Sequence, residues 1–176
     1  MNAPAQAAQN TRRQTVIERS YAAPVADVWQ LWTTKEGIES WWGPEGFAVT
    51  VRKLDLRPGG ELLYAMTAVA PEMVAYMKSA GMPTTTESCI TYQEVTAPRV
   101  LKYRHLVDFI PGVEAYDVGT LVELHASATG TRLVLTLDAM HDDPWTERAA
   151  MGWQSELGKL EKVLAIHNTT ANKAGN

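Results

Sequence analysis

The fold of this chain is decided by the stretch PWTERAAMGWQSELGKLEKVLAIH, residues 144–167. On a helical wheel with Trp153 at its centre, apolar or small residues gather on one side. They are Thr146, Ala149, Ala150, Leu157, Leu160 and Leu164. The opposite side holds Met151, Ser155, Lys159 and Lys162. The pattern predicts a long amphipathic helix. Because strand-like segments precede it, the simplest fold wraps one sheet around this helix, so that both bury their apolar faces.

Length and composition favour a single globular domain. The chain has 176 residues, of which 45% are hydrophobic and 20% are charged, and these values are ordinary for a globular protein. We predict one domain over residues 15–168, a disordered lead over residues 1–14 and a disordered tail over residues 169–176.

Charge and hydropathy argue against several classes of partner. The net charge is -4 and no strongly basic run is present, which argues against a nucleic-acid partner. No segment approaches the roughly 20 apolar residues of a membrane span, and the N-terminus lacks the apolar core of a secretory signal. The single cysteine, Cys89, excludes an internal disulfide. We therefore expect a cytoplasmic protein with no nucleic-acid partner and no membrane contact.

The segments before the helix alternate in the manner of β-strands. A first strand is predicted at residues 15–21, then one short helix at residues 24–33 and a second one capped by Thr34. Short turns join most of the later strands, so the sheet should be antiparallel. The six later strands are predicted at residues 47–56, 61–67, 84–95, 100–109, 116–126 and 131–140.

Residues 68–83 interrupt the run of strands. They include a short predicted helix at residues 71–77 and carry Met73, Met77 and Met82. Methionine adapts to apolar surfaces of varied shape. Three interpretations therefore stay open for this insert: a mobile lid, a dimer contact or a surface excursion.

Several short motifs, taken in their order and spacing, resemble a known family. They are RSYAAP (residues 19–24) leading into VWQLW (28–32), WWGP (41–44), DLRPGG (55–60), YQE (92–94), GTRL (130–133) and MGW (151–153), the last continued by Leu157, Leu160 and Leu164. Over about residues 16–165 the chain resembles the activator-of-Hsp90-ATPase-homologue-1-like family, within the START/Bet v 1-like superfamily.

The resemblance implies an α+β helix-grip fold. In such a fold a curved seven-stranded antiparallel sheet surrounds the C-terminal helix, and two short helices close one end. The resemblance also implies a hydrophobic cavity between sheet and helix, which in the superfamily holds lipids, sterols, polyketides and similar molecules. The family shares no catalytic motif, so it implies no catalytic residue. Its name comes from a co-chaperone with an additional Hsp90-binding domain, which we do not expect here.

Aromatic residues are the first candidates for the wall of such a cavity. Trp41 and Trp42 offer flat apolar surfaces and one N–H donor each, although either one could equally pack in the core. Tyr64 and Met66 share a strand face with Leu62 and are core or cavity residues. On the C-terminal helix, Ala149 and Trp153 are further candidates. Small side chains at residues 149, 150 and 152 leave space, so we expect the first half of the helix to roof the cavity, whereas the stripe from Trp153 through Leu164 closes the core.

A second group of candidates lies on one predicted strand. Tyr103, His105 and Phe109 share a face of residues 100–109, and on a concave face they would place polar groups in an apolar pocket. His105 is the one acid–base candidate. The alternatives are a structural histidine at a sheet edge, or a bulge that turns these residues outward.

We predict neither a metal nor a cofactor. His141, Asp142 and Asp143 have the composition of metal ligands but no second cluster to complete a site, and Asp143 is better explained as a helix cap. Cys89 has no base beside it in sequence that would make it a nucleophile.

Three functions follow from these residues. The first is the binding of a hydrophobic or aromatic small molecule between sheet and helix. The second is an enzyme of the same fold that catalyses cyclisation, condensation or hydrolysis of a polyketide-like substrate. The third is a chaperone-linked or stress-related interaction protein with a filled core and an exposed apolar patch near Met73 and Met77. A homodimer is compatible with all three.

Overall fold

The computed structural model describes residues 13–174, with side chains to residue 167. The strands are β1 Gln14–Tyr21, β2 Phe47–Leu54, β3 Glu61–Ala68, β4 Thr85–Thr96, β5 Val100–Val107, β6 Tyr116–Ser127 and β7 Gly130–Asp138. The helices are α1 Val25–Thr33, α2 Lys35–Trp41, α3 Pro71–Ser79 and α4 Asp143–Ala174.

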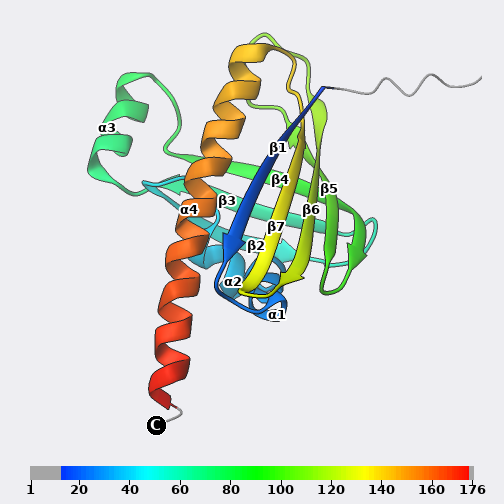
Figure 1. Cartoon of the computed structure of the whole chain (residues 1–176). Helices are drawn as coiled ribbons and strands as arrows, with labels where there is room; N and C mark the ends of the chain where they lie inside the picture. Colours follow the sequence, from blue (N-terminus) through cyan, green and yellow to red (C-terminus); the bar gives the residue numbers. More distant parts are fainter. Residues whose placement is uncertain (1–12, 175–176) are drawn as a thin grey trace, which may run out of the picture.

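The strands form one curved antiparallel sheet around α4 (Figure 1). Its order is β1-β7-β6-β5-β4-β3-β2. Every neighbouring pair from β2 to β7 is consecutive in the chain, whereas β1 pairs with β7. Helices α1 and α2 close one end, where α2 contacts both β2 and α4. This is the predicted α+β helix-grip fold, with the two short helices after the first strand.

The turn between β2 and β3 shows why the hairpins form where the sequence predicts them. Gly59 has a φ of +80°, which glycine adopts without strain. A Cβ on Gly60 would lie 2.1 Å from the carbonyl oxygen of Asp55. Only glycine fits there, so the Pro58-Gly59-Gly60 turn ends β2 and leads into β3.

A β-bulge corrects the predicted face of the second strand. The pairing of β2 with β3 shifts between Val51 and Lys53. Val49 and Val51 are buried, but Lys53 is exposed and Leu54 turns toward the core. A bulge inserts one unpaired residue and so reverses the alternation beyond it. Strict alternation from Val49 and Val51 would place Lys53 on the apolar face, and the bulge places Leu54 there instead.

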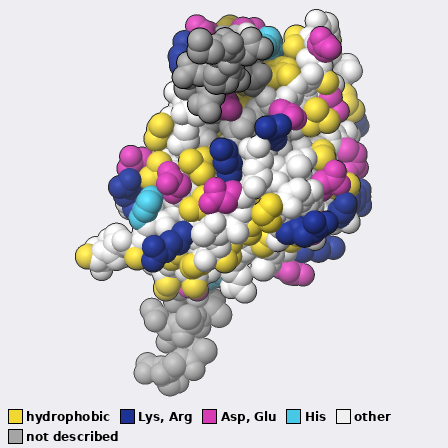
Figure 2. Space-filling model, turned by 90° about the vertical axis from the view of Figure 1, so that its right-hand side faces the viewer, with side chains coloured by type: hydrophobic (Ala, Val, Ile, Leu, Met, Phe, Trp, Pro, Cys, Tyr) yellow, Lys and Arg dark blue, Asp and Glu magenta, His cyan; other side chains and the backbone are white. Residues whose placement is uncertain are grey.

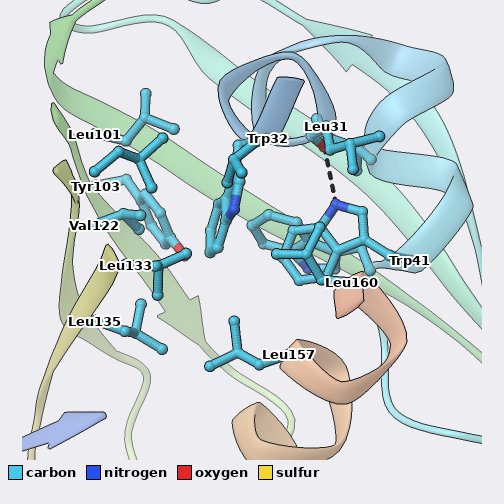
Figure 3. Close-up of a cluster of buried hydrophobic side chains, with 14 of the residues drawn as sticks. Leu31, Trp32, Trp41, Leu101, Tyr103, Val122, Leu133, Leu135, Leu157 and Leu160 are labelled. Atoms are coloured by element: carbon cyan, nitrogen blue, oxygen red, sulfur yellow. Dashed lines mark hydrogen bonds between the residues drawn. The ribbon is translucent and has the colours of Figure 1, made fainter. Parts of the chain in front are cut away.

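The core is centred on Trp32 of α1. Its ring centroid lies 4.7 Å from that of Trp41 and 5.4 Å from that of Trp42. Figure 3 shows Trp32 between the leucines of the sheet and Trp41, with Leu157 and Leu160 approaching from α4. Leu157 and Leu160 are fully buried and Leu164 is 3% exposed. The second half of α4 therefore closes the core, as the helical wheel predicts.

Both ends of α4 differ from the prediction. Its first backbone amides are capped by Asp142, whose Oδ1 accepts a hydrogen bond from the Trp145 amide at 2.8 Å. Asp143, which the sequence suggests as the cap, instead pairs with Arg13. The helix continues to Ala174, so the predicted disordered tail is helical as far as that residue. The predicted lead ends before Gln14, where β1 begins, and its residues 1–12 lie outside the described residues.

The surface mixes charges of both signs. On the face shown in Figure 2, lysine and arginine side chains alternate with acidic ones, and hydrophobic side chains lie scattered between them. Among the helices described, none is long and apolar enough to cross a membrane.

Candidate functional site

A cavity of about 250 Å³ lies between the sheet and the first half of α4. The helix lines it at the spacing of one face, with Trp145, Arg148, Ala149, Trp153 and Glu156. The sheet contributes residues from five neighbouring strands: Tyr64, Ile90, Tyr103, His105, Val107, Val118, Thr120, Leu137 and Asp138. Trp42, Phe109 and Met140 complete the wall from the connections.

The cavity brings together most of the residues that the sequence singled out. The wall includes Trp42, Tyr64, Tyr103, His105, Phe109, Ala149 and Trp153. The small side chain of Ala149 lies in the first half of α4, where the predicted stripe thins. Whether these residues hold a ligand stays a prediction.

Trp41 and Trp42 are neighbours in sequence but occupy different environments. Trp41 is fully buried, and its Nε1 donates to the Leu31 carbonyl oxygen at 2.9 Å (Figure 3). Trp42 caps α2 in an extended conformation, so its side chain leaves the helix in a different direction. Its ring lies 5.7 Å from that of Trp153 and 6.4 Å from that of Tyr103. Trp41 is a core residue, and Trp42 belongs to the wall.

Met66 is also absent from the wall. It shares the inner face of β3 with Leu62 and Tyr64 and packs half-buried against the core. A Cβ placed on Gly43 would lie 3.8 Å from its Cγ. Met66 therefore packs under the connection that follows α2, beyond the end of the cavity.

Tyr103 and His105 place polar atoms in this apolar wall. The Tyr103 hydroxyl and the His105 Nε2 are buried and have no hydrogen-bond partner among the described residues. Burial raises the pKa of the Tyr103 hydroxyl well above its usual value. Burial lowers the pKa of His105, although Asp108 and Asp117 oppose the shift. The imidazole is therefore neutral at pH 7 and can donate or accept one hydrogen bond at Nε2.

Glu156 is a buried, charged-type wall residue that sequence reasoning missed, and Thr120, Asp138 and Arg148 are further polar residues of the wall that it did not name. It is 9% exposed, and its Oε2 has no hydrogen-bond partner among the described residues. Burial raises its pKa to about 8, while Lys159 and the backbone amide of Gly43 act to lower it. A signal was available, because Glu156 comes three residues after Trp153 and so shares its face of the helix.

The mouth of the cavity is aromatic. Phe109 is 51% exposed and its ring lies 6.2 Å from that of Trp145. The exposed guanidinium of Arg148 lies 5.1 Å from the centroid of the Trp145 ring. These three residues form the rim, where the wall meets the surface. The cation over the indole ring stabilises this rim.

Other chemical candidates lie outside the cavity wall. Cys89 is half-buried, and burial raises the pKa of its thiol, which disfavours a nucleophilic role. His141 contacts the Tyr116 hydroxyl through Nδ1 at 2.8 Å. In the part of the chain that the structure describes, no three metal-ligating side chains converge.

The insert forms α3 to one side of the sheet (Figure 1). None of its described residues lines the cavity, so the lid interpretation finds no support in the wall. Met77 is buried, whereas Tyr76 and Met82 are exposed.

The sheet, the long helix and the cavity between them define a helix-grip protein. The chain belongs to the activator of Hsp90 ATPase homolog 1-like family, whose sequence model matches residues 22–165. No curated protein matches the chain.

Solved structures from several bacteria share the fold. A protein from Chromobacterium violaceum is 22% identical with a TM-score of 0.71, over 86% of this chain and 96% of its own. One from Nitrosomonas europaea is 26% identical with a TM-score of 0.67, over 88% and 95%. The AHSA1 protein from Silicibacter pomeroyi is 20% identical with a TM-score of 0.69, over 88% and 99%.

Proposed function

We propose that this protein binds a small hydrophobic or aromatic molecule in the cavity between the sheet and α4. The observation that carries the proposal is an aromatic-walled pocket between the sheet and α4 that side chains leave open and that reaches the surface at its aromatic rim. Protein interiors are close-packed and keep few voids larger than a water molecule. A space of 250 Å³ is many times the roughly 10–15 Å³ that a single water molecule needs.

The size of the cavity limits its occupant. Pockets for drug-sized ligands usually span about 300–1,000 Å³, so 250 Å³ suits a molecule of one or two rings. Burial of about 200 Å² of apolar ligand surface contributes roughly 5 kcal/mol. That term alone would correspond to an affinity of about 0.2 mM, and the cost of association, at least about 4 kcal/mol, still has to be subtracted from it. Polar groups in the wall must supply the rest.

A filled cavity tests the proposal. Ala149→Phe places a ring in the cavity, whereas Met151→Phe adds the same ring at a position that is 71% exposed. Indole and 2-naphthol at about ten times Kd should raise the melting temperature of the wild type by roughly 3–6 °C. The Met151→Phe protein should respond equally, and the Ala149→Phe protein should not respond. If no hydrophobic compound in a broad panel shifts the wild type, the proposal fails.

An enzyme of the same fold is the second candidate. The placement of His105 and Glu156 in one wall favours it, because a neutral imidazole and a carboxyl of raised pKa are suited to acid–base chemistry near neutral pH. Chemical conversion of a bound polyketide-like compound, lost in both His105→Asn and Glu156→Gln, would support it. Recovery of the compound unchanged would leave binding as the function.

The interaction-protein hypothesis has less support. It requires a filled core and an exposed apolar patch near Met73 and Met77. Tyr76 and Met82 beside them are exposed, but the space between the sheet and α4 is not filled by side chains. A cytoplasmic location and a homodimer stay predictions. Light scattering of the purified protein gives its mass in solution and so tests the dimer.

A further inference from the structure

Glu156 is a buried carboxyl without a cation of its own. Lys159 follows it by one helical turn, but its Nζ donates to the carbonyl oxygens of Gly43 and Phe47, at 2.8 and 3.3 Å. Among the described residues, no ion pair involves Glu156. An uncompensated buried carboxyl is costly, so a fold that keeps one at a cavity wall calls for an explanation.

Aromatic rings surround this carboxyl. Trp42, Trp153, Tyr64 and Tyr103 all line the same cavity. The negative charge of Glu156 contributes to the raised pKa values of both phenols, Tyr64 and Tyr103, so the two hydroxyls lie within its electrostatic reach. The faces of indole and phenol rings carry negative potential and attract organic cations.

The other charged and titratable groups of the cavity wall do not give Glu156 a cationic partner. His105 on β5 is neutral at pH 7, because burial lowers its pKa. Asp138 on β7 accepts a hydrogen bond from Gln14 at 3.0 Å. Arg148 stacks on Trp145 at the rim. Within the described wall, the carboxyl therefore faces aromatic rings and no cation that is free to pair with it.

We infer that the cavity selects a small aromatic or alicyclic amine, whose protonated nitrogen pairs with Glu156 while its hydrocarbon part fills the aromatic space. This inference rests on the proposed function and names its ligand class. A monocation supplies the missing partner of the carboxylate and uses the ring faces as well. A neutral carbonyl compound would accept one hydrogen bond from the protonated carboxyl but would leave the ring faces without a cation.

Proton balance makes the pairing measurable. With a pKa of about 8, Glu156 is mostly protonated at pH 7 in the empty cavity, and roughly one molecule in ten carries the carboxylate. An ammonium ion that enters stabilises the carboxylate, so one proton leaves Glu156 for the solvent. Affinity for the amine should therefore rise with pH up to about 8, and fall again above about 10 where an alkylamine loses its own proton.

The test compares 2-phenylethylamine with 2-phenylethanol, which has the same size but no charge. Calorimetry at pH 7 in two buffers of different ionisation enthalpy gives both affinity and proton release. The wild type should bind the amine at least about tenfold more tightly than the alcohol, with close to one proton released per amine bound. Glu156→Gln keeps the shape and removes the charge, so it should bind both compounds alike. Glu161→Gln, an exposed acid of the same helix, should behave as the wild type.

The outcomes separate this inference from the proposed function. If the wild type binds the alcohol as tightly as the amine, or if Glu156→Gln keeps the preference, the inference is overturned and the cavity is a site for neutral ligands. If neither compound binds to the wild type, and the panel of neutral aromatics also fails, the proposed function falls with it. Matched melting curves of Glu156→Gln and Glu161→Gln at pH 6 check that both variants are folded.

Discussion

The indole rings of Trp32 and Trp153 stack with centroids 5.8 Å apart and planes 12° apart. Trp32 comes from α1 and is 1% exposed in the centre of the core, whereas Trp153 comes from α4 and lines the cavity. The stack is thus the boundary between the packed half of the molecule and its hollow half. It also joins the end-closing helices to the long helix.

Removal of the Trp153 ring should destabilise both the packed half and the hollow half of the molecule. Trp153→Ala leaves the Trp32 ring without its partner and lets the cavity extend into the core. We expect a loss of about 3 kcal/mol in the free energy of unfolding, measured with urea, because buried tryptophan truncations cost about 3–5 kcal/mol and Trp153 is only half-buried. Met151→Ala, on the exposed side of the same helix, should change it by less than about 0.5 kcal/mol. Equal losses of unfolding free energy in the two variants would contradict the role of Trp153 at this boundary.

The second half of α4 should behave as ordinary core. Leu160 is fully buried, so Leu160→Ala removes packed methyl groups and leaves a void. The free energy of unfolding should fall by about 3 kcal/mol. Ile166→Ala is the matched control, since Ile166 is 64% exposed. A small effect of Leu160→Ala would mean that this half of the helix does not close the core.

Glu156 should make the protein less stable as the pH rises. Its pKa is about 8 in the fold, against an ordinary value of 4.5. Between these two values the folded protein keeps a proton that the unfolded chain has lost. The free energy of unfolding therefore falls with pH across this window, by up to about 5 kcal/mol in total, and the extra stability is complete only below pH 4.5.

Glu156→Gln removes that dependence. Both proteins are unfolded with urea from pH 5 to pH 8. The free energy of unfolding of the variant, relative to that of the wild type, should rise with each increase in pH. Burial of neutral His105 acts in the other direction, below its ordinary pKa of 6.5, but it is common to both proteins and cancels in the difference. Parallel pH profiles would show that Glu156 is ionised in the fold.

The cap of α4 gives a local test near the cavity mouth. Asp142 accepts the Trp145 amide at 2.8 Å, so Asp142→Ala should cost about 1 kcal/mol of unfolding free energy. Asp143→Ala removes only an exposed pair with Arg13 and should cost less than about 0.5 kcal/mol. If thermal melts show that Asp143→Ala is the more destabilising of the two variants, Asp143 is the cap of α4.

Local patterns predict the strands, the helices and one sheet around the last helix, and the helix-grip architecture is what the family resemblance implies. Alternation placed the strands, the Pro58-Gly59-Gly60 turn fixed a hairpin, and the wheel around Trp153 found the closing face of α4. These signals are local, because side-chain period and turn chemistry depend on neighbours in sequence. Alternation failed at the bulge after Val51, since one extra residue reverses the faces and has no distinct sequence signature.

The cavity itself was harder to predict residue by residue. Its walls depend on the distance between sheet and helix, which sequence periodicity does not encode. Trp41 and Trp42 are adjacent and identical, and only the end of α2 between them separates core from wall. Met66 has the correct face but lies too far along β3. Glu156 is hard to predict because an acid on an apolar stripe is usually solvated, whereas here α4 carries it into the interior.

The most direct test of a ligand-binding cavity is native mass spectrometry of the wild type and Ala149→Phe, expressed and purified side by side. The account predicts that the wild type carries the added mass of one small molecule, or takes up one indole per chain when indole is supplied. The Ala149→Phe protein should do neither. A wild type that stays bare with every hydrophobic compound offered, or a variant that takes up as much as the wild type, would contradict it.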